Sequence, residues 1–318
     1  MTKMSDSPIF IGGSPRSGTT LLGALLGASE RTVCVPESQF KTRLVTSPEQ
    51  LPLSAEALEQ AYHRILDDFR FDIWDIDVAV IRRRPEGLDR YADILLWLVG
   101  LYGAKSGEVM EGARWVDHTP RNLQDAPVLA GIFPEAKFVH ILRDGRAVFN
   151  SLQSLDWGPN TATETAKRWM REIAMALAAE QHLDSDAIIQ VQYERLVREP
   201  REVMKELTDF LGMERAELDL ERKGFDAPSY TANQHEIVGK EIDPSRADRW
   251  KNTLSKRDIE LFEATAGTLL QLLGYRRLFP EGATEAGSIE QLELQIREFV
   301  QRRFNRVRYA YRKFRTIE

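Results

Sequence analysis

The sequence predicts a single α/β domain, built on a P-loop-like parallel β-sheet flanked by helices, with helical insertions and a C-terminal basic helix. A short apolar run ending in glycines, residues 8–12, precedes a polar loop and then a helical pattern over residues 19–28. Further apolar runs alternate with helical patterns, which indicates right-handed crossovers between parallel strands. From Ser288 the chain has the pattern of one long amphipathic helix with a basic end.

The other elements follow from local signals. Residues 54–69 are predicted as a helix with Ser54 as its N-cap, and residues 86–102 as a helix that follows Pro85. Both belong to an insertion between strands. The other predicted elements are strands at 114–118, 137–142 and 187–191, and helices at 122–133, from Asp144, and at about 200–211. We expect a main domain over residues 1–280 and a separate amphipathic basic helix over residues 281–318.

Composition limits the function classes. The 318 residues are 42% hydrophobic and 29% charged, as in ordinary globular proteins, and the net charge of −6 argues against general nucleic-acid binding. Cys34 is the only cysteine, which excludes an intrachain disulfide and favours a packing role. The start of the chain has no apolar signal-like segment, and the longest apolar stretch, residues 94–102, is too short for a bilayer. We expect a cytoplasmic protein without a transmembrane segment.

The loop Gly13–Thr20, GSPRSGTT, matches the phosphate-binding pattern GxxxxGK[ST] except that Thr19 replaces the lysine. Its backbone N–H groups and the following helix N-terminus suit a phosphate or sulfate oxyanion without that lysine. The missing lysine argues against nucleoside-triphosphate chemistry, and Arg16 supplies a charged fork instead. The alternative is a glycine turn that only packs a helix on the sheet.

The segment PRSGTTLL, residues 15–22, resembles the 5′-phosphosulfate loop of sulfotransferases, particularly tyrosylprotein sulfotransferases and related bacterial enzymes. The resemblance continues through Cys34 and Glu37, and resumes in residues 133–151, 191–200 and 240–250. It implies 3′-phosphoadenosine 5′-phosphosulfate (PAPS) as the sulfonate donor.

The resemblance also implies a set of PAPS-binding residues. Arg143 and Ser151 match the 3′-phosphate ligands, and both are expected at the carboxyl edge of the sheet. Arg143 could instead form a surface ion pair with Asp144, and Arg146 could neutralise the site or pair on the surface. The other expected contacts are Ser14, Arg16, Ser17, Gly18, Thr19 and Thr20 in the loop, Tyr193 at the adenine unless it packs in the core, and Lys240, before which residues 229–234 would close over the nucleotide.

Two residues are candidates for activating the acceptor hydroxyl. Glu37 matches the glutamate that is the general base of tyrosylprotein sulfotransferases, although a solvated loop glutamate is the alternative. His118 stands where many relatives carry a lysine, and an imidazole can accept a proton or donate to an oxyanion. A hydrogen-bonded structural histidine is its alternative. Arg16 is expected to be catalytic as well, as a clamp on the sulfonate oxygens.

No metal requirement is expected, because the five histidines and Cys34 form no ligand motif. Trp157 and Trp169 could line the acceptor pocket or pack in the core, with the core favoured. The acceptor is a hydroxyl compound that the sequence does not specify: a carbohydrate, a small molecule or a peptide tyrosine. Within the insertion at residues 45–112, side chains suited to such acceptors are Trp74, Arg82, Arg83, Arg84 and Trp97.

Three function classes follow. The first is a PAPS-dependent sulfotransferase, the second a metal-dependent P-loop kinase, and the third a catalytically silent nucleotide-binding scaffold. The C-terminal helix is expected either to dock with a solvated face or to contact an anionic membrane surface, a partner or an acidic acceptor. The oligomeric state is left open.

Overall fold

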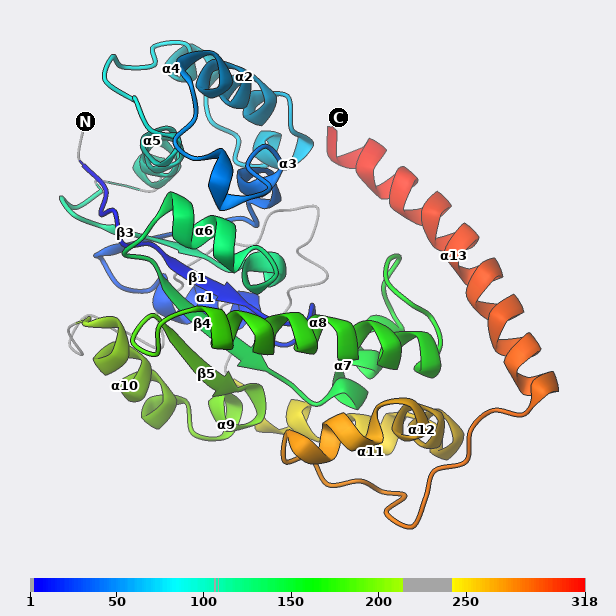
Figure 1. Cartoon of the computed structure of the whole chain (residues 1–318). Coiled ribbons are helices and arrows are strands. Elements are labelled where there is room, and N and C mark those ends of the chain that lie inside the picture. The colour runs from blue at the N-terminus through cyan, green and yellow to red at the C-terminus, as the bar shows by residue number, and fades with distance from the viewer. Residues whose placement is uncertain (1–2, 106, 108, 214–241, 318) are drawn as a thin grey trace.

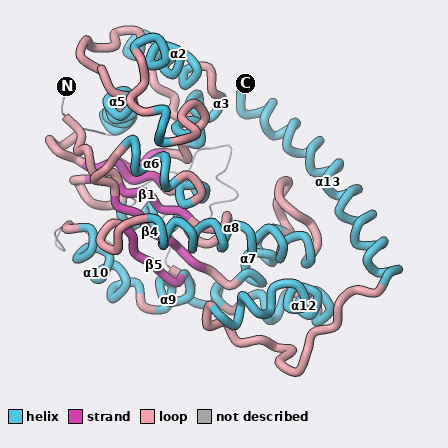
Figure 2. Tube along the Cα trace, viewed as in Figure 1, coloured by secondary structure: helices cyan, strands magenta, loops and turns pink. Residues whose placement is uncertain are grey.

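The structure, a computed structural model, describes residues 3–105, 107, 109–213 and 242–317. Its centre is a five-stranded parallel sheet in the order β2-β3-β1-β4-β5, with helices on both faces (Figures 1 and 2). The strands are β1 (Ile9–Gly12), β2 (Thr32–Val35), β3 (Arg114–Asp117), β4 (Lys137–Leu142) and β5 (Ile188–Gln192). The predicted fold class is confirmed.

The helices occupy the crossovers and the chain after the sheet. They are α1 (Thr19–Leu26), α2 (Ala55–Leu66), α3 (Phe69–Asp72), α4 (Val78–Ile81), α5 (Tyr91–Ala104), α6 (Ala126–Ile132), α7 (Gly145–Leu152), α8 (Ala162–His182), α9 (Tyr193–Arg198), α10 (Pro200–Leu211), α11 (Trp250–Thr253), α12 (Lys256–Leu272) and α13 (Ser288–Ile317). Short 3₁₀ turns lie at Gln39–Thr42, Pro48–Gln50, Pro120–Leu123 and Pro244–Ala247.

The first strand lies at the centre of the sheet and fixes the place of the site. β1 pairs with β3 on one side and β4 on the other, and all four of its residues are buried, as expected for a strand covered on both faces. Because the strands are parallel, the loops that follow β1, β3 and β4 leave the same edge. This edge carries the glycine-rich loop, His118 and Arg143.

Most predicted elements agree with the structure, with local differences. Ser54 caps α2, its hydroxyl accepting a hydrogen bond from the Ala57 N–H at 3.2 Å. The helix predicted from residue 86 begins at Tyr91, after the Arg90 N-cap, and the helix predicted at 122–133 is divided into a 3₁₀ turn and α6. α9 and α12 were not predicted.

The C-terminal helix α13 runs along one side of the molecule (Figure 1). It contacts the domain through polar side chains and through Leu294, which packs against a hydrophobic cluster of α7, α8 and α12. Glu298 accepts hydrogen bonds from the backbone and side-chain nitrogens of Asn160 at 2.7 and 3.3 Å, and Asn305 donates to the Asn160 side chain at 2.8 Å. Two helical turns after Asn305, the Arg312 Nε donates a hydrogen bond to the Asp156 carboxylate at 2.9 Å. These contacts repeat every seven residues, so one stripe of the helix meets the 156–160 loop.

The apolar side chains of α13 lie on the opposite side. We call this side the outer face of α13. Its members are between 55% and 69% exposed: Leu292, Ile296, Phe299, Val300, Phe304, Val307, Tyr311 and Phe314. The predicted amphipathic helix is present, but its polar stripe docks and its apolar stripe faces outward. The predicted division at residue 280 stays a prediction.

None of the described helices is long and apolar enough to cross a membrane.

Candidate active site

The glycine-rich loop between β1 and α1 is shaped by close contacts that only glycine permits. Gly13 has φ +153°, and a Cβ there would lie 2.3 Å from the Ile141 carbonyl oxygen. Gly18, at φ +100°, would place a Cβ 2.5 Å from the Tyr193 ring. The loop therefore lies against β4 and against the residue that follows β5, with the first turn of α1 at its end.

Arg16 is the charged centre of this loop. It adopts φ +73°, a left-handed conformation that costs energy in a non-glycine residue and is frequent at functional sites. Its Nε donates a hydrogen bond to the Ser151 hydroxyl on α7 at 3.1 Å. Burial, followed by the charge of Arg143, lowers the pKa of Arg16 to about 10, so the guanidinium stays charged at neutral pH.

Arg143 follows β4 and connects three segments. Its guanidinium donates to the Arg16 carbonyl at 2.6 Å and to the Arg246 carbonyl at 3.2 Å. It also stacks over the Tyr193 ring at 4.1 Å from the ring centre. Among the described residues its Nε has no hydrogen-bond partner. The structure does not contain the surface pair of Arg143 with Asp144 that was the alternative.

Tyr193 combines the two roles that the sequence left open. The side chain is almost fully buried against Gly18, yet its ring also lines the cleft beside Arg143. Thr19, Thr20 and Gly18 line the same cleft.

The two loop serines differ from the threonines. The Ser14 hydroxyl donates to the Glu172 carboxylate on α8 at 2.7 Å and is buried. Its side chain therefore supports the loop from behind rather than facing the cleft. The Ser17 hydroxyl is fully buried and finds no hydrogen-bond partner among the described residues. Lys240 and the segment at 229–234 lie outside the described residues.

Glu37 and His118 line the same cleft from neighbouring loops, after β2 and β3. The Glu37 carboxylate is 26% exposed and lies 3.5 Å from the Arg70 guanidinium. The Gln39 amide also donates to it at 3.2 Å. His118 is 2% exposed, and its side chain packs against Gly23 of α1. Burial lowers the pKa of His118 although Glu37 and Asp117 oppose this, so the imidazole is neutral at physiological pH.

A buried ion pair beneath these two residues joins their loops. The Lys41 ammonium lies 3.3 Å from Asp117, and both side chains are at most 2% exposed. Ser38 donates a hydrogen bond to one Asp117 oxygen, while the Thr119 N–H and the Asn122 amide donate to the other at 2.8 and 2.9 Å. Burial raises the pKa of Asp117, but Lys41 and these donors outweigh it and lower the pKa. Asp117 and Lys41 were not predicted, although Asp117 immediately precedes His118 and Lys41 follows Glu37 by four residues.

The cleft has a volume of about 1510 Å³ and is strongly basic. Among the described residues, eleven arginines and Lys167 line it against four carboxylates, those of Glu37, Asp156, Glu164 and Glu172. Besides the loop residues, its wall includes Arg302, Arg306 and Arg312 from α13. The geometry therefore suits a ligand with several negative charges.

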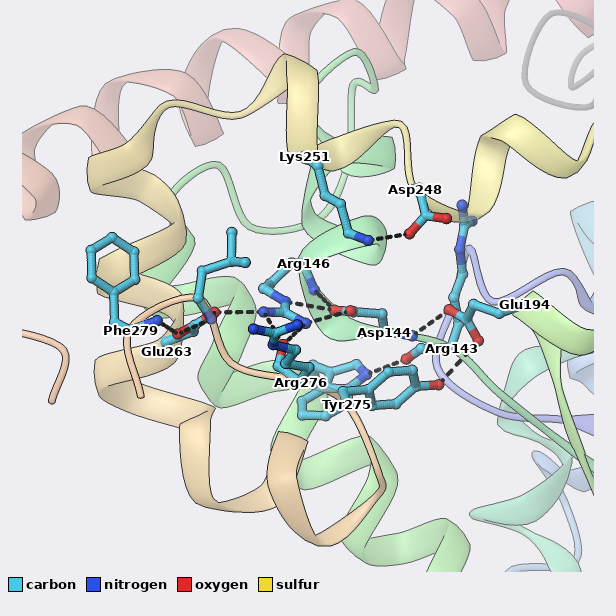
Figure 3. A network of polar contacts seen from close by, with 12 residues as sticks. Arg143, Asp144, Arg146, Glu194, Asp248, Lys251, Glu263, Tyr275, Arg276 and Phe279 are labelled. Atoms are coloured by element: carbon cyan, nitrogen blue, oxygen red, sulfur yellow. Dashed lines mark hydrogen bonds and ion pairs between the residues drawn. The ribbon is translucent and has the colours of Figure 1, made fainter. Parts of the chain in front are cut away.

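Arg146 lies outside this cleft, in a buried network that Figure 3 shows. Its guanidinium pairs with Asp144 at 2.7 Å and with Glu263 at 2.5 Å, and it stacks over Trp250 at 4.1 Å. Asp144 in turn caps α7, and its own N–H donates to Glu194. Arg146 therefore neither faces the site nor pairs on the surface: it joins α7 to α12 beneath the loop that carries Arg143.

The structure places none of the five acceptor residues expected in the insertion on the cleft: the two tryptophans are buried, and Arg82, Arg83 and Arg84 are not among the residues that line it. Trp74 and Trp97 are at most 5% exposed and pack in the core with Phe40 and Tyr62, because burying their large rings stabilises the insertion. The insertion instead contributes Arg70 and Ile73 to the cleft. Trp169 is a core residue, whereas Trp157 lines the cleft near Arg168.

Among the described residues, no group of three or more histidine, cysteine or acidic side chains is arranged to hold a metal ion.

The arrangement defines an α/β protein of the P-loop-like class, with a glycine-rich loop open to a basic cleft at the carboxyl edge of the sheet. The model of the Sulfotransferase family matches residues 8–217. The chain therefore belongs to the Sulfotransferase family, and the predicted family is confirmed.

Two named relatives and one solved structure that are similar to this chain are also sulfotransferases. The chain is 26% identical over 255 residues to protein-tyrosine sulfotransferase A of Caenorhabditis elegans, covering 78% of this chain and 58% of that protein. It is 29% identical over 208 residues to the protein-tyrosine sulfotransferase of Drosophila melanogaster, covering 64% and 37%. The sulfotransferase domain of the Synechococcus PCC 7002 olefin synthase superposes with a TM-score of 0.59 at 25% identity, covering 86% of this chain and 96% of the domain. The chain spans about half the length of the two animal relatives.

Proposed function

We propose that this protein transfers a sulfonate group from PAPS to a hydroxyl acceptor. The observation that carries this proposal is the contact between Arg16 and Ser151, which joins the two proposed anion-binding segments in one basic cleft. A nucleotide with phosphate groups at both ends needs two such segments at a fixed separation. A triphosphate enzyme of the P-loop class would instead need a lysine where Thr19 stands.

The residues present fit this donor. Arg143 lines the cleft, and its Nε is a buried polar atom that lacks a partner among the described residues, as expected for an atom that binds a ligand or water. In this proposal the loop from Gly13 to Thr20 holds the 5′-phosphosulfate, and Arg143 with Ser151 holds the 3′-phosphate. Tyr193 lies beside Arg143 and offers its ring to the adenine. Lys240 is part of the proposal on the family resemblance alone.

The bound donor supplies an activated sulfonate with a stable phosphate leaving group. The protein's own residues supply the proton transfer and the positive charge. Glu37 is the proposed general base, because its carboxylate is partly exposed in the cleft, whereas His118 is buried and neutral. Arg16 and the backbone N–H groups at the start of α1 stabilise negative charge on the transferring group. Neutral His118 is left to orient or hydrogen-bond the reacting groups.

The positive charge of the cleft indicates what kind of acceptor it would bind. Arg70 and the arginines of α13 line the same cleft as the glycine-rich loop and add positive charge to it. This supports an acceptor that carries negative groups beside its hydroxyl, within a carbohydrate, a small molecule or a peptide with a tyrosine. The two animal relatives are named for protein tyrosine, which keeps the peptide among the acceptors to assay first.

Calorimetry with PAPS, followed by transfer of radiolabelled sulfonate to pooled acceptors, tests the proposal. Arg16→Ala should lose donor binding at least tenfold, whereas Arg64→Ala, at an exposed position on α2, should leave it unchanged. Absence of PAPS binding by the unaltered chain would overturn the proposal. Binding of ATP with Mg²⁺ in its place would indicate a kinase, and tight PAPS binding without turnover on any acceptor would indicate a silent scaffold.

A further inference from the structure

We propose that the outer face of α13 docks on an anionic phospholipid membrane surface. This inference does not depend on the reaction in the cleft. Its basis is an apolar helix face that is exposed, bordered by arginines that pair with no carboxylate in the part of the chain that the structure describes.

The uncovered face belongs to the docked helix, because α13 is attached by its other side. Glu298, Asn305 and Arg312 bind the 156–160 loop through the contacts described above. Phe304 and Val307 on the outer face are 59% and 69% exposed. Amphipathic helices of globular proteins normally bury the apolar stripe, so the reversed arrangement indicates a second surface that covers it.

The positive charge of α13 indicates which kind of surface covers its outer face. From residue 299 to 317 the helix has seven basic residues and no acidic one. Among the described residues, Arg297, Arg303, Arg306 and Arg308 form no salt bridge. A second copy packed in parallel on this face would bring two basic segments together, and they would repel each other. An anionic surface is complementary to it.

The arginine side chains have the geometry that a lipid interface favours. Arg303 lies over the Phe299 ring at 4.7 Å, and Arg308 over the Phe304 ring at 6.0 Å. Each guanidinium thus lies over a ring of the outer face, and both arginines are exposed. Rings that enter the acyl boundary with guanidinium groups at headgroup level would preserve this arrangement.

The outer face is also broader than the seam of a two-helix coiled coil. Phe299 and Val300 are adjacent in the sequence, and Phe304 and Val307 follow on the next turns. The apolar residues of the outer face therefore occupy more than the two positions per heptad that form such a seam. A flat apolar phase accommodates that width, whereas a single partner helix would cover only part of it.

The position of α13 would bring a docked membrane close to the cleft. Arg302, Asn305 and Arg312 line the cleft from the inner side of the same helix. A membrane on the outer face would therefore lie one helix diameter, about 10 Å, from the cleft wall. A reaction in the cleft would then take place close to the lipid headgroups.

Vesicle flotation with the full chain tests this proposal. We expect binding to phosphatidylcholine vesicles that contain phosphatidylglycerol, at least about tenfold stronger than to phosphatidylcholine alone, and weakened by salt. The pair Arg303→Gln and Arg308→Gln should lower binding about thirtyfold, since each basic residue at such a surface contributes about fivefold. The pair Phe304→Ser and Val307→Ser should lower it at least about tenfold.

The control is Leu272→Ser, at a side chain of α12 that is 78% exposed, which should bind vesicles like the unaltered chain. All these positions are exposed, so the variants should fold. Failure to bind either vesicle would overturn the proposal and leave an acidic protein as the occupant. Sedimentation that shows a dimer abolished by Phe304→Ser and Val307→Ser would assign the face to a second copy and also overturn it.

Discussion

The Arg16 Nε donates a hydrogen bond to the Ser151 hydroxyl, although 135 residues separate them in the chain. Arg16 belongs to the loop after β1, and Ser151 to α7 after β4. The contact is possible because β1 and β4 are paired in parallel, so that both following segments leave the same edge of the sheet. One side chain therefore belongs to both proposed ends of the donor site.

This contact predicts that Arg16 and Ser151 act together. Ser151→Ala should weaken PAPS binding less than Arg16→Ala, because it removes one neutral hydrogen-bond partner, worth about 1 kcal/mol, rather than a charge. In calorimetry the double variant should lose less than the sum of the two single losses. Fully additive losses would show that the two residues bind independently.

Glu37→Gln should separate chemistry from binding. The substitution keeps the size of the side chain but removes the proton acceptor, so kcat should fall by about 10²–10⁴ while PAPS affinity stays within about twofold. Single-turnover transfer with radiolabelled donor measures the first quantity and calorimetry the second. Glu49→Gln, at an exposed position, is the matched control. If Glu37→Gln keeps full turnover, His118 becomes the candidate base.

Much of the fold could be predicted because local patterns coincide with the packing. The strand at residues 137–142 was predicted with the bounds that the structure shows, since six apolar-rich residues lie between a turn and the capping residue Asp144. α9 was missed because its six residues follow β5 directly, with no intervening turn signal. Helix α13 was found, but its docked side depends on Asn160 and Asp156, which lie far away in the chain.

The site was predictable only where a motif carried it. The loop at residues 13–20, Arg143 and Ser151 belong to recognisable segments, and they meet as expected. Asp117 lacked such a signal, because an acidic residue at the end of a strand is ordinary until Lys41 is seen beside it. Trp74 and Trp97 appeared suited to an acceptor for the opposite reason: aromatic residues serve cores and binding sites equally well, and burial decides between them.

The buried pair of Lys41 and Asp117 predicts a large loss of stability on substitution of one partner. Lys41→Met should lower the free energy of unfolding by about 3–5 kcal/mol, because it leaves the Asp117 carboxylate buried without its counter-ion. Urea denaturation followed by circular dichroism measures this. Lys251→Met, at an exposed lysine paired with Asp248, should cost about 1 kcal/mol or less. Equal losses in the two variants would contradict a buried ion pair.

His118 predicts a pH dependence of stability at weakly acidic pH. Its pKa is lowered in the folded protein, mainly by burial, from an ordinary value of 6.5. The unfolded chain therefore binds the proton first as the pH falls below 6.5, and folded-state stability that is present above this pH is lost towards the lower folded-state pKa. The slope from this residue is at most about 1.4 kcal/mol per pH unit. His118→Gln should flatten the curve of unfolding free energy between pH 7 and 5, compared with His63→Gln at an exposed histidine. An unchanged slope in His118→Gln would show that the imidazole is protonated as readily in the folded protein as in the unfolded chain.

The docking of α13 includes buried polar contacts beside the packing of Leu294, so a substitution in one polar contact should loosen the helix without unfolding the domain. Arg312→Ala leaves Asp156, which is 8% exposed, without its bidentate partner, and this should cost about 1–3 kcal/mol of docking free energy. Hydrogen exchange should then accelerate about five- to a hundredfold in α13 and in the 156–160 loop, while the strands of the sheet keep their protection. Arg308→Ala is the control, because Arg308 lies over the Phe304 ring instead of binding the 156–160 loop. Hydrogen exchange in α13 and in this loop should stay unchanged in that variant. Faster exchange throughout the sheet in Arg312→Ala would mean that the helix stabilises the whole domain rather than one wall of the cleft.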